Sequence, residues 1–94
     1  MKNLEEVRGK VENYLKNNGY YTVINLTESD YPHIVKTGVD ILYTEWLPSY
    51  VGGGFATSVV NNDLQRATMC ADITNIRALK FYALLLENTK NPLL

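Results

Sequence analysis

Three consecutive glycines, Gly52, Gly53 and Gly54, are the residues best suited to hold an anion, and the hydroxyls of Thr57 and Ser58 follow them closely. Glycine has no Cβ, so backbone N–H groups in such a run can turn toward a phosphate. The spacing fits neither a Walker A loop, which needs a lysine after its last glycine, nor the GxGxxG pattern. We favour a flexible turn or a close-packed bulge and keep a phosphate cradle as the alternative.

Arg66 and Arg77 could add positive charge to such a cradle. They are eleven residues apart, or three helical turns, so on an unbroken helix they share one face and could grip a carboxylate or phosphate with two hydrogen bonds each. Trp46 and Tyr50 flank the glycines and could stack on a base. These residues, with the glycines, Thr57 and Ser58, define the alternative function: binding of a nucleotide or another small anionic ligand. Ordinary salt bridges to the acidic central segment would explain both arginines equally well.

Catalytic chemistry has weaker support. A thiol nucleophile needs a neighbouring base, and the chain has one cysteine, Cys70, and one histidine, His33. Small and apolar neighbours predict that Cys70 is an inert buried thiol. The central carboxylates have no companion histidine or third acid, and we expect them on the solvated surface: Glu28, Asp30, Asp40 and Glu45. We therefore predict no enzyme, no cofactor and no metal site.

Aromatic residues are concentrated in the middle of the chain: Tyr20, Tyr21, Tyr31, Tyr43, Trp46, Tyr50 and Phe55. They are too many for a small sheet to bury on one side, so some must be exposed. Tyrosine and tryptophan are frequent in interface hot spots because they add large contact area at modest entropic cost. We predict that an aromatic surface around the glycines contacts a protein partner or a second copy of the chain, through Tyr31, Tyr43, Trp46, Tyr50 and Phe55.

Composition narrows the class of protein. The length of 94 residues, with 46% hydrophobic and 20% charged residues, predicts a single domain over residues 1–94. A net charge of -1 argues against binding duplex nucleic acid. No apolar run approaches the ~20 residues of a membrane span, and the charged first 16 residues do not resemble a signal peptide, so we expect a cytoplasmic protein without membrane contact. The abundance of Lys, Asn and Tyr, which have AT-rich codons, hints at a low-GC bacterium or its phage.

The first element that must position these residues is an amphipathic helix. Leu4, Val7, Val11 and Tyr14 recur at helical spacing, and residues 17–19, Asn-Asn-Gly, predict its end. Strands are expected at residues 20–27, 33–36 and 55–60, where β-branched and aromatic residues alternate. Tyr31 should be extended because a proline follows it.

Residues 39–47 fit two patterns. A strand is favoured because Val, Ile, Tyr, Thr and Trp are mediocre helix formers. The alternative is a helix, since Val39, Leu42, Tyr43 and Trp46 are spaced i, i+3, i+4 and i+7.

Residues 64–88 contain neither Gly nor Pro and predict one long helix capped by Asn62 or Asp63. Its expected apolar stripe is Met69, Ile73, Ile76, Leu79, Ala83 and Leu86. The alternative is an interruption at residues 72–75 with Thr74 capping a second helix. Leu93 and Leu94 form an apolar tail that could dock on the core or on a partner.

The predicted fold is therefore α+β: an N-terminal helix, an antiparallel sheet of three or four strands and a long C-terminal helix, with an all-α fold as the alternative. The predicted function is that of a small intracellular, non-enzymatic interaction protein, in an accessory or regulatory role.

Overall fold

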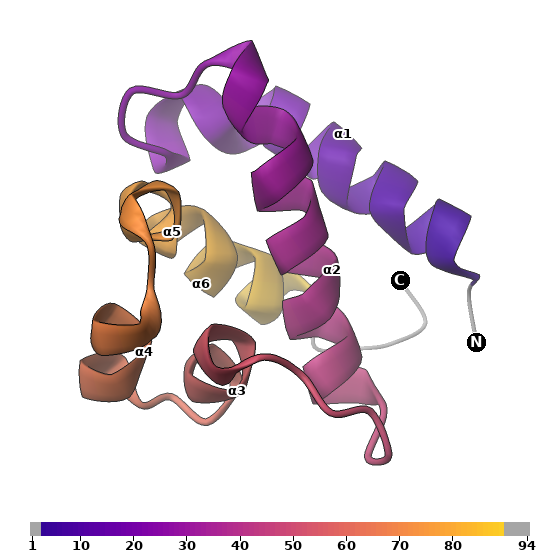
Figure 1. Ribbon diagram of the computed structural model, residues 1–94. Coiled ribbons are helices and arrows are strands. Elements are labelled where there is room, and N and C mark those ends of the chain that lie inside the picture. The colour runs from indigo at the N-terminus through magenta and orange to yellow at the C-terminus, as the bar shows by residue number, and fades with distance from the viewer. Residues whose placement is uncertain (1–2, 90–94) are drawn as a thin grey trace.

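The computed structural model describes residues 3–89, and every regular element in that range is helical (Figure 1). The elements are α1 (Leu4–Thr22), the 3-10 helix η1 (Glu28–Asp30), α2 (Tyr31–Trp46), α3 (Gly54–Val60), α4 (Leu64–Cys70), α5 (Ile73–Arg77) and α6 (Leu79–Asn88). The predicted antiparallel sheet is wrong, and the all-α alternative is correct. The expected docking of Leu93 and Leu94 lies outside the described residues.

Helix α1 continues one turn past its predicted end. Two polar side chains bond back along it: Asn18 Nδ2 donates to Tyr14 O at 3.0 Å, and Thr22 Oγ1 donates to Asn18 O at 2.8 Å. Gly19 is buried, and a Cβ there would lie 2.6 Å from Cδ2 of Leu26. Gly19 therefore lets Leu26, in the loop that follows α1, pack directly against this helix. The predicted strand at residues 20–27 is wrong because its first part is the end of α1.

Helix α2 replaces two predicted strands, at residues 33–36 and 39–47. The Thr27 and Asp30 side chains form a capping box on η1, the 3-10 helix that leads directly into α2. Tyr31 is helical, with φ -55° and ψ -51°, and not extended as expected. Pro32 fits the first turn because no hydrogen bond is required of its nitrogen there.

Burial explains why this β-branched sequence is helical. One face of α2 is fully covered by its neighbours and consists of Ile34, Val35, Gly38, Val39, Ile41 and Leu42. A Cβ on Gly38 would lie 2.9 Å from Val11 Cγ1 of α1 and 3.2 Å from Leu85 Cδ2 of α6. Gly38 is thus the point where α2 crosses both helices at close range. The hydrophobic burial outweighs the modest propensity deficit of the individual residues.

The predicted strand at residues 55–60 is helix α3, which buries Phe55 and Ala56. After it, Asn62 adopts a left-handed φ of 59°. Asp63 then caps α4 by accepting a hydrogen bond from Arg66 N at 3.0 Å, which confirms one of the two predicted caps.

The single long helix predicted for residues 64–88 is wrong, because the chain turns twice within it. The alternative, an interruption near Asp72, is correct. The cap of α5, however, is Asp72 and not Thr74: Asp72 Oδ1 accepts a hydrogen bond from Asn75 N at 2.8 Å. The expected stripe is also wrong: Met69 and Ile73 are 76% and 75% exposed. These breaks allow α6 to turn its buried residues Phe81, Tyr82 and Leu85 into the core.

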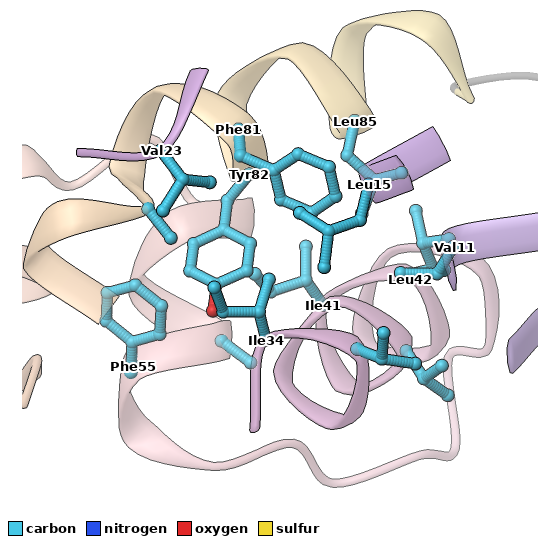
Figure 2. Packing of buried hydrophobic residues seen from close by; sticks show 14 of the residues in the cluster. Val11, Leu15, Val23, Ile34, Ile41, Leu42, Phe55, Phe81, Tyr82 and Leu85 are labelled. Carbon is cyan, nitrogen blue, oxygen red and sulfur yellow. The ribbon is translucent and has the colours of Figure 1, made fainter. Parts of the chain in front are cut away.

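The core lies where α1, α2, α3 and α6 meet. Figure 2 shows Phe81, Tyr82 and Leu85 of α6 packed among Leu15, Ile34 and Phe55. The Tyr82 hydroxyl donates to Asn75 Oδ1 at 2.6 Å, and burial raises the pKa of this tyrosine. Across residues 3–89 we find no helix whose length and apolar character would suit a membrane crossing.

Candidate functional site

The glycine-containing loop, residues 47–53, joins α2 to α3 and is pinned to α2 by one carboxylate. Asp40 Oδ1 accepts a hydrogen bond from the Tyr50 hydroxyl at 2.6 Å, and Asp40 Oδ2 accepts one from Gly53 N at 3.3 Å. We call this arrangement the Asp40 clamp. Asp40 was expected on the solvated surface; it is half-buried there, and its carboxylate holds the loop.

Gly52 shows why the loop needs glycine. A Cβ at this position would lie 2.0 Å from Oγ1 of Thr44, one helical turn beyond Asp40 on α2. The Thr44 hydroxyl is itself held by donating to Asp40 O at 2.6 Å. The loop backbone therefore lies directly on the helix, as the close-packed interpretation of the glycines predicts.

Electrostatics and ring packing reinforce the clamp. The hydrogen bond to Asp40, followed by partial burial, raises the pKa of Tyr50 to about 12. The rings of Tyr43 and Tyr50 meet edge to face, with centroids 5.5 Å apart and planes at 80°. At neutral pH Tyr50 keeps its proton, and this proton is the one donated to the carboxylate.

The same clamp removes the features that a phosphate cradle requires. The Gly53 N–H already points at a carboxylate, whose charge would repel a second anion. The hydroxyls of Thr57 and Ser58 donate to the backbone oxygens of Gly52 and Gly54, at 3.5 and 2.8 Å, and Ser58 is buried. The Asp40 carboxylate occupies the position that a phosphate would take beside the Gly53 N–H.

The two arginines do not join this loop. Arg77 donates to both carboxylate oxygens of Asp30, at 3.0 and 3.2 Å, and to the carbonyls of Ile24 and Asn25. These bonds lower the pKa of Asp30 and raise that of Arg77. Helix α5, which ends at Arg77, lies on the opposite side of the molecule from the loop (Figure 1).

Arg66 is exposed and pairs with Asp63 at 3.8 Å. The breaks after α4 and α5 remove the unbroken helix that would have placed the two arginines on one face. The residues predicted for the anionic ligand are therefore not brought together.

The five predicted partner-binding aromatics differ in accessibility. Phe55 is buried, with its ring 5.6 Å from that of Tyr82, and belongs to the core. Tyr31, Tyr43 and Trp46 are half-buried, and the Trp46 indole donates to Thr89 O at 3.1 Å. Tyr50 is 37% exposed.

Sequence reasoning missed the most exposed apolar residue of this loop. Val51 is 91% exposed at the tip, beside Tyr50. The sequence carried no signal for this, because Phe55, on the other side of the same glycines, is buried. We call Tyr43, Tyr50 and Val51 the loop surface; Trp46 instead lines a hollow with Val11 of α1 and Leu85 of α6.

Cys70 and His33 form no catalytic pair. Cys70 is exposed, so the prediction of a buried thiol is wrong; α4 ends at this residue and buries only Ala67. His33 Nε2 lies 2.8 Å from Asp72 Oδ2. Within the described part of the chain, no group of three His, Cys, Asp or Glu residues could hold a metal ion.

Comparisons with protein-family models, with curated proteins and with solved structures found no match for this chain.

Proposed function

We propose that this chain is a small non-catalytic interaction protein that acts inside the cell and binds a protein partner through the loop surface. The observation that supports this is the Asp40 clamp, which holds a highly exposed apolar tip on a rigid helix. An exposed valine gains from burial by a partner, about 1.5 kcal/mol or more if it is fully covered. The neighbouring rings of Tyr43 and Tyr50 add a residue type that is enriched in interface hot spots.

The Asp40 clamp lowers the conformational entropy that the loop would lose on binding a partner. A free seven-residue loop would lose conformational freedom on binding, which weakens affinity. Here two hydrogen bonds to Asp40 and the Tyr43–Tyr50 ring contact order the loop before any partner arrives. The loop surface is thus preorganised, in the way that favours slow dissociation of a complex.

Nucleotide or anion binding receives no support from the geometry. The N–H of Gly53 is used by Asp40, and Arg77 is used by Asp30. We therefore do not carry that alternative further.

A photo-cross-linking residue placed at Val51 tests the proposal in extracts of the source organism. The matched control carries the same residue at Glu12, which is exposed on α1. We expect a discrete adduct from position 51 and none from position 12. An adduct of twice the 10.7 kDa chain mass would identify the partner as a second copy.

Affinity for the partner so identified then decides the question. Val51→Ser should weaken binding about tenfold, which corresponds to ~1.4 kcal/mol, while Glu12→Ser should leave it unchanged. Asp40→Ala should weaken binding mainly through faster dissociation, because the loop loses its anchor. A Val51→Ser variant within twofold of wild type, or the absence of any adduct specific to position 51, would contradict the proposal.

A further inference from the structure

A hollow of about 330 Å³ lies between α1, α2 and α6 and shares no lining residue with the loop surface. Its floor consists of core side chains that are each at most 2% exposed: Val7, Val11, Leu42 and Leu85. Figure 2 shows Val11, Leu42 and Leu85 close to one another at one side of the core. The half-buried rings of Tyr14 and Trp46 also line the hollow. Apolar groups from three helices therefore surround it.

The described part of the chain ends in the lining of this hollow. Thr89, the last described residue, is one of the lining residues and is 5% exposed. Its carbonyl oxygen accepts a hydrogen bond from Trp46 Nε1 at 3.1 Å, and its hydroxyl donates to Leu85 O. Beside it, Asn88 Nδ2 donates to Tyr14 Oη at 2.7 Å. These bonds hold the end of α6 on α1 and α2, so the chain continues from a fixed point at the hollow.

Residues 90–94, Lys-Asn-Pro-Leu-Leu, have the length and the sequence to fill the hollow. Pro92 cannot continue a helix and biases the residue before it toward extended backbone. Leu93 is four residues beyond Thr89, and four extended residues span up to about 14 Å. The part of α1 that lines the hollow, residues 7–17, is about 15 Å long. Both leucines can therefore reach most of the hollow.

The polar part of the lining favours a peptide segment over a purely apolar molecule. Asn13 and Asn17 lie one turn apart on α1, and Asn88 belongs to α6. Carboxamides both donate and accept hydrogen bonds, which the N–H and C=O groups of an extended segment require. Lys10 is the one charged residue of the described lining, and it is exposed, so its ammonium group stays in water while its methylene stem adds apolar surface.

We infer that Leu93 and Leu94 dock in this hollow and cover Trp46 and the core residues beneath it. Burial of the two side chains removes apolar surface from water on both the segment and the hollow. The tether to Thr89 gives the segment an effective concentration in the millimolar range. A free apolar peptide at micromolar concentration would compete poorly with it. The chain's own segment is therefore favoured over a separate partner at this site.

The direct test is the measurement of nuclear Overhauser effects in the full chain, with isotope-labelled leucine and valine methyl groups. We expect contacts from the Leu93 or Leu94 methyl groups to the indole protons of Trp46 and to the methyl groups of Val7 or Val11. A mixture of labelled and unlabelled chains separates contacts within one copy from contacts between two copies.

Trp46 provides a second measurement because it is the only tryptophan of the chain. In the double variant Leu93→Ser, Leu94→Ser, its emission should shift to longer wavelength and acrylamide should quench it more strongly, because water reaches the indole. In urea unfolding, the folding equilibrium constant of this variant should fall about tenfold, a difference of ~1.4 kcal/mol. The matched control is Leu64→Ser, at a leucine that is 73% exposed on α4. It should leave the emission unchanged and the equilibrium constant within about twofold of wild type.

Three results would overturn the inference. Methyl contacts from Leu93 and Leu94 to Leu79 or Leu86 would place the segment in a different groove, which α3, α4 and α6 line. Contacts found only between copies would assign the hollow to a second chain. An absence of such contacts, together with unchanged tryptophan emission in the double variant, would show that the segment does not dock.

Discussion

Replacement of Gly38 by alanine tests the central helix crossing. In an open helical position, glycine to alanine stabilises a protein by about 1 kcal/mol, because alanine has the higher helix propensity. Gly9, on α1, is such a position: nothing lies within 4 Å of the added Cβ. Gly38 is different, because the new Cβ would lie 2.9 Å from Val11 Cγ1 and 3.2 Å from Leu85 Cδ2.

The expected change in stability is the balance between overpacking around Gly38 and the higher helix propensity of alanine. Valine in a helix has one strongly preferred rotamer, so the Val11 methyl group cannot simply rotate away. Overpacking of a core costs about 1–3 kcal/mol, against the gain of about 1 kcal/mol from propensity. Gly38→Ala should therefore be about 1–3 kcal/mol less stable than Gly9→Ala, although the chemical change is identical. For a domain of this size each kcal/mol corresponds to roughly 4–8 °C in Tm.

Urea unfolding followed by circular dichroism measures both free energies of unfolding under the same conditions. A double-mutant cycle provides the control: Val11→Ala removes the methyl group that the new Cβ meets, so the two substitutions should couple favourably by at least about 0.5 kcal/mol. Equal stability of Gly38→Ala and Gly9→Ala would refute the close crossing. Additive effects in the cycle would show that Val11 is not the obstacle.

Three further predictions concern buried or paired groups. Tyr82→Phe should destabilise the protein by about 1–3 kcal/mol in urea unfolding, because Asn75 Oδ1, which is buried, loses its donor; an unchanged midpoint would contradict this. In Asp40→Asn, the pKa of Tyr50 should fall from about 12 toward the ordinary 10.0, as followed by NMR of labelled tyrosine rings; a value that stays near 12 would mean that burial dominates. The pKa of Asp30 is lowered from 3.8 by Arg77, so the stability this pair adds is present above that value and is lost as the pH falls below it. The Tm advantage of wild type over Asp30→Asn should accordingly shrink on acidification, and an advantage independent of pH would contradict the pairing.

Local sequence patterns correctly predicted helix α1, from its apolar face, and the start of helix α4, from its capping residue. Leu4, Val7, Val11 and Tyr14 identified α1; Val7 and Val11 are buried, Tyr14 is half-buried and Leu4 is exposed. Asp63 was one of two expected caps and does cap α4. The partner of the cap lies three residues away, and the helical spacing of the apolar residues lies within α1 itself, so both signals are visible in the sequence.

Elements whose conformation depends on distant partners were predicted wrongly. The β-branched sequence of α2 favours a strand locally, but Gly38 allows close contact with α1 and α6, and burial makes the helix stable. Gly19 indicated a helix end and instead admits Leu26 against the helix. Leu79, Ala83 and Leu86 were expected to form the inward face, but Leu79 and Leu86 are only half-buried and Ala83 is exposed, while α6 directs Phe81, Tyr82 and Leu85 into the core.

The candidate site shows the same division. Composition and spacing by themselves determined that the chain has one histidine and one cysteine, and that glycines and aromatic residues are concentrated near its middle. Only the tertiary structure decided the use of those residues: Asp40 takes the Gly53 N–H, Asp30 takes Arg77, and Phe55 enters the core while Val51 stays outside. Hydrogen bonds and burial between segments far apart in the chain depend on how the helices cross, and no local pattern encodes those crossings.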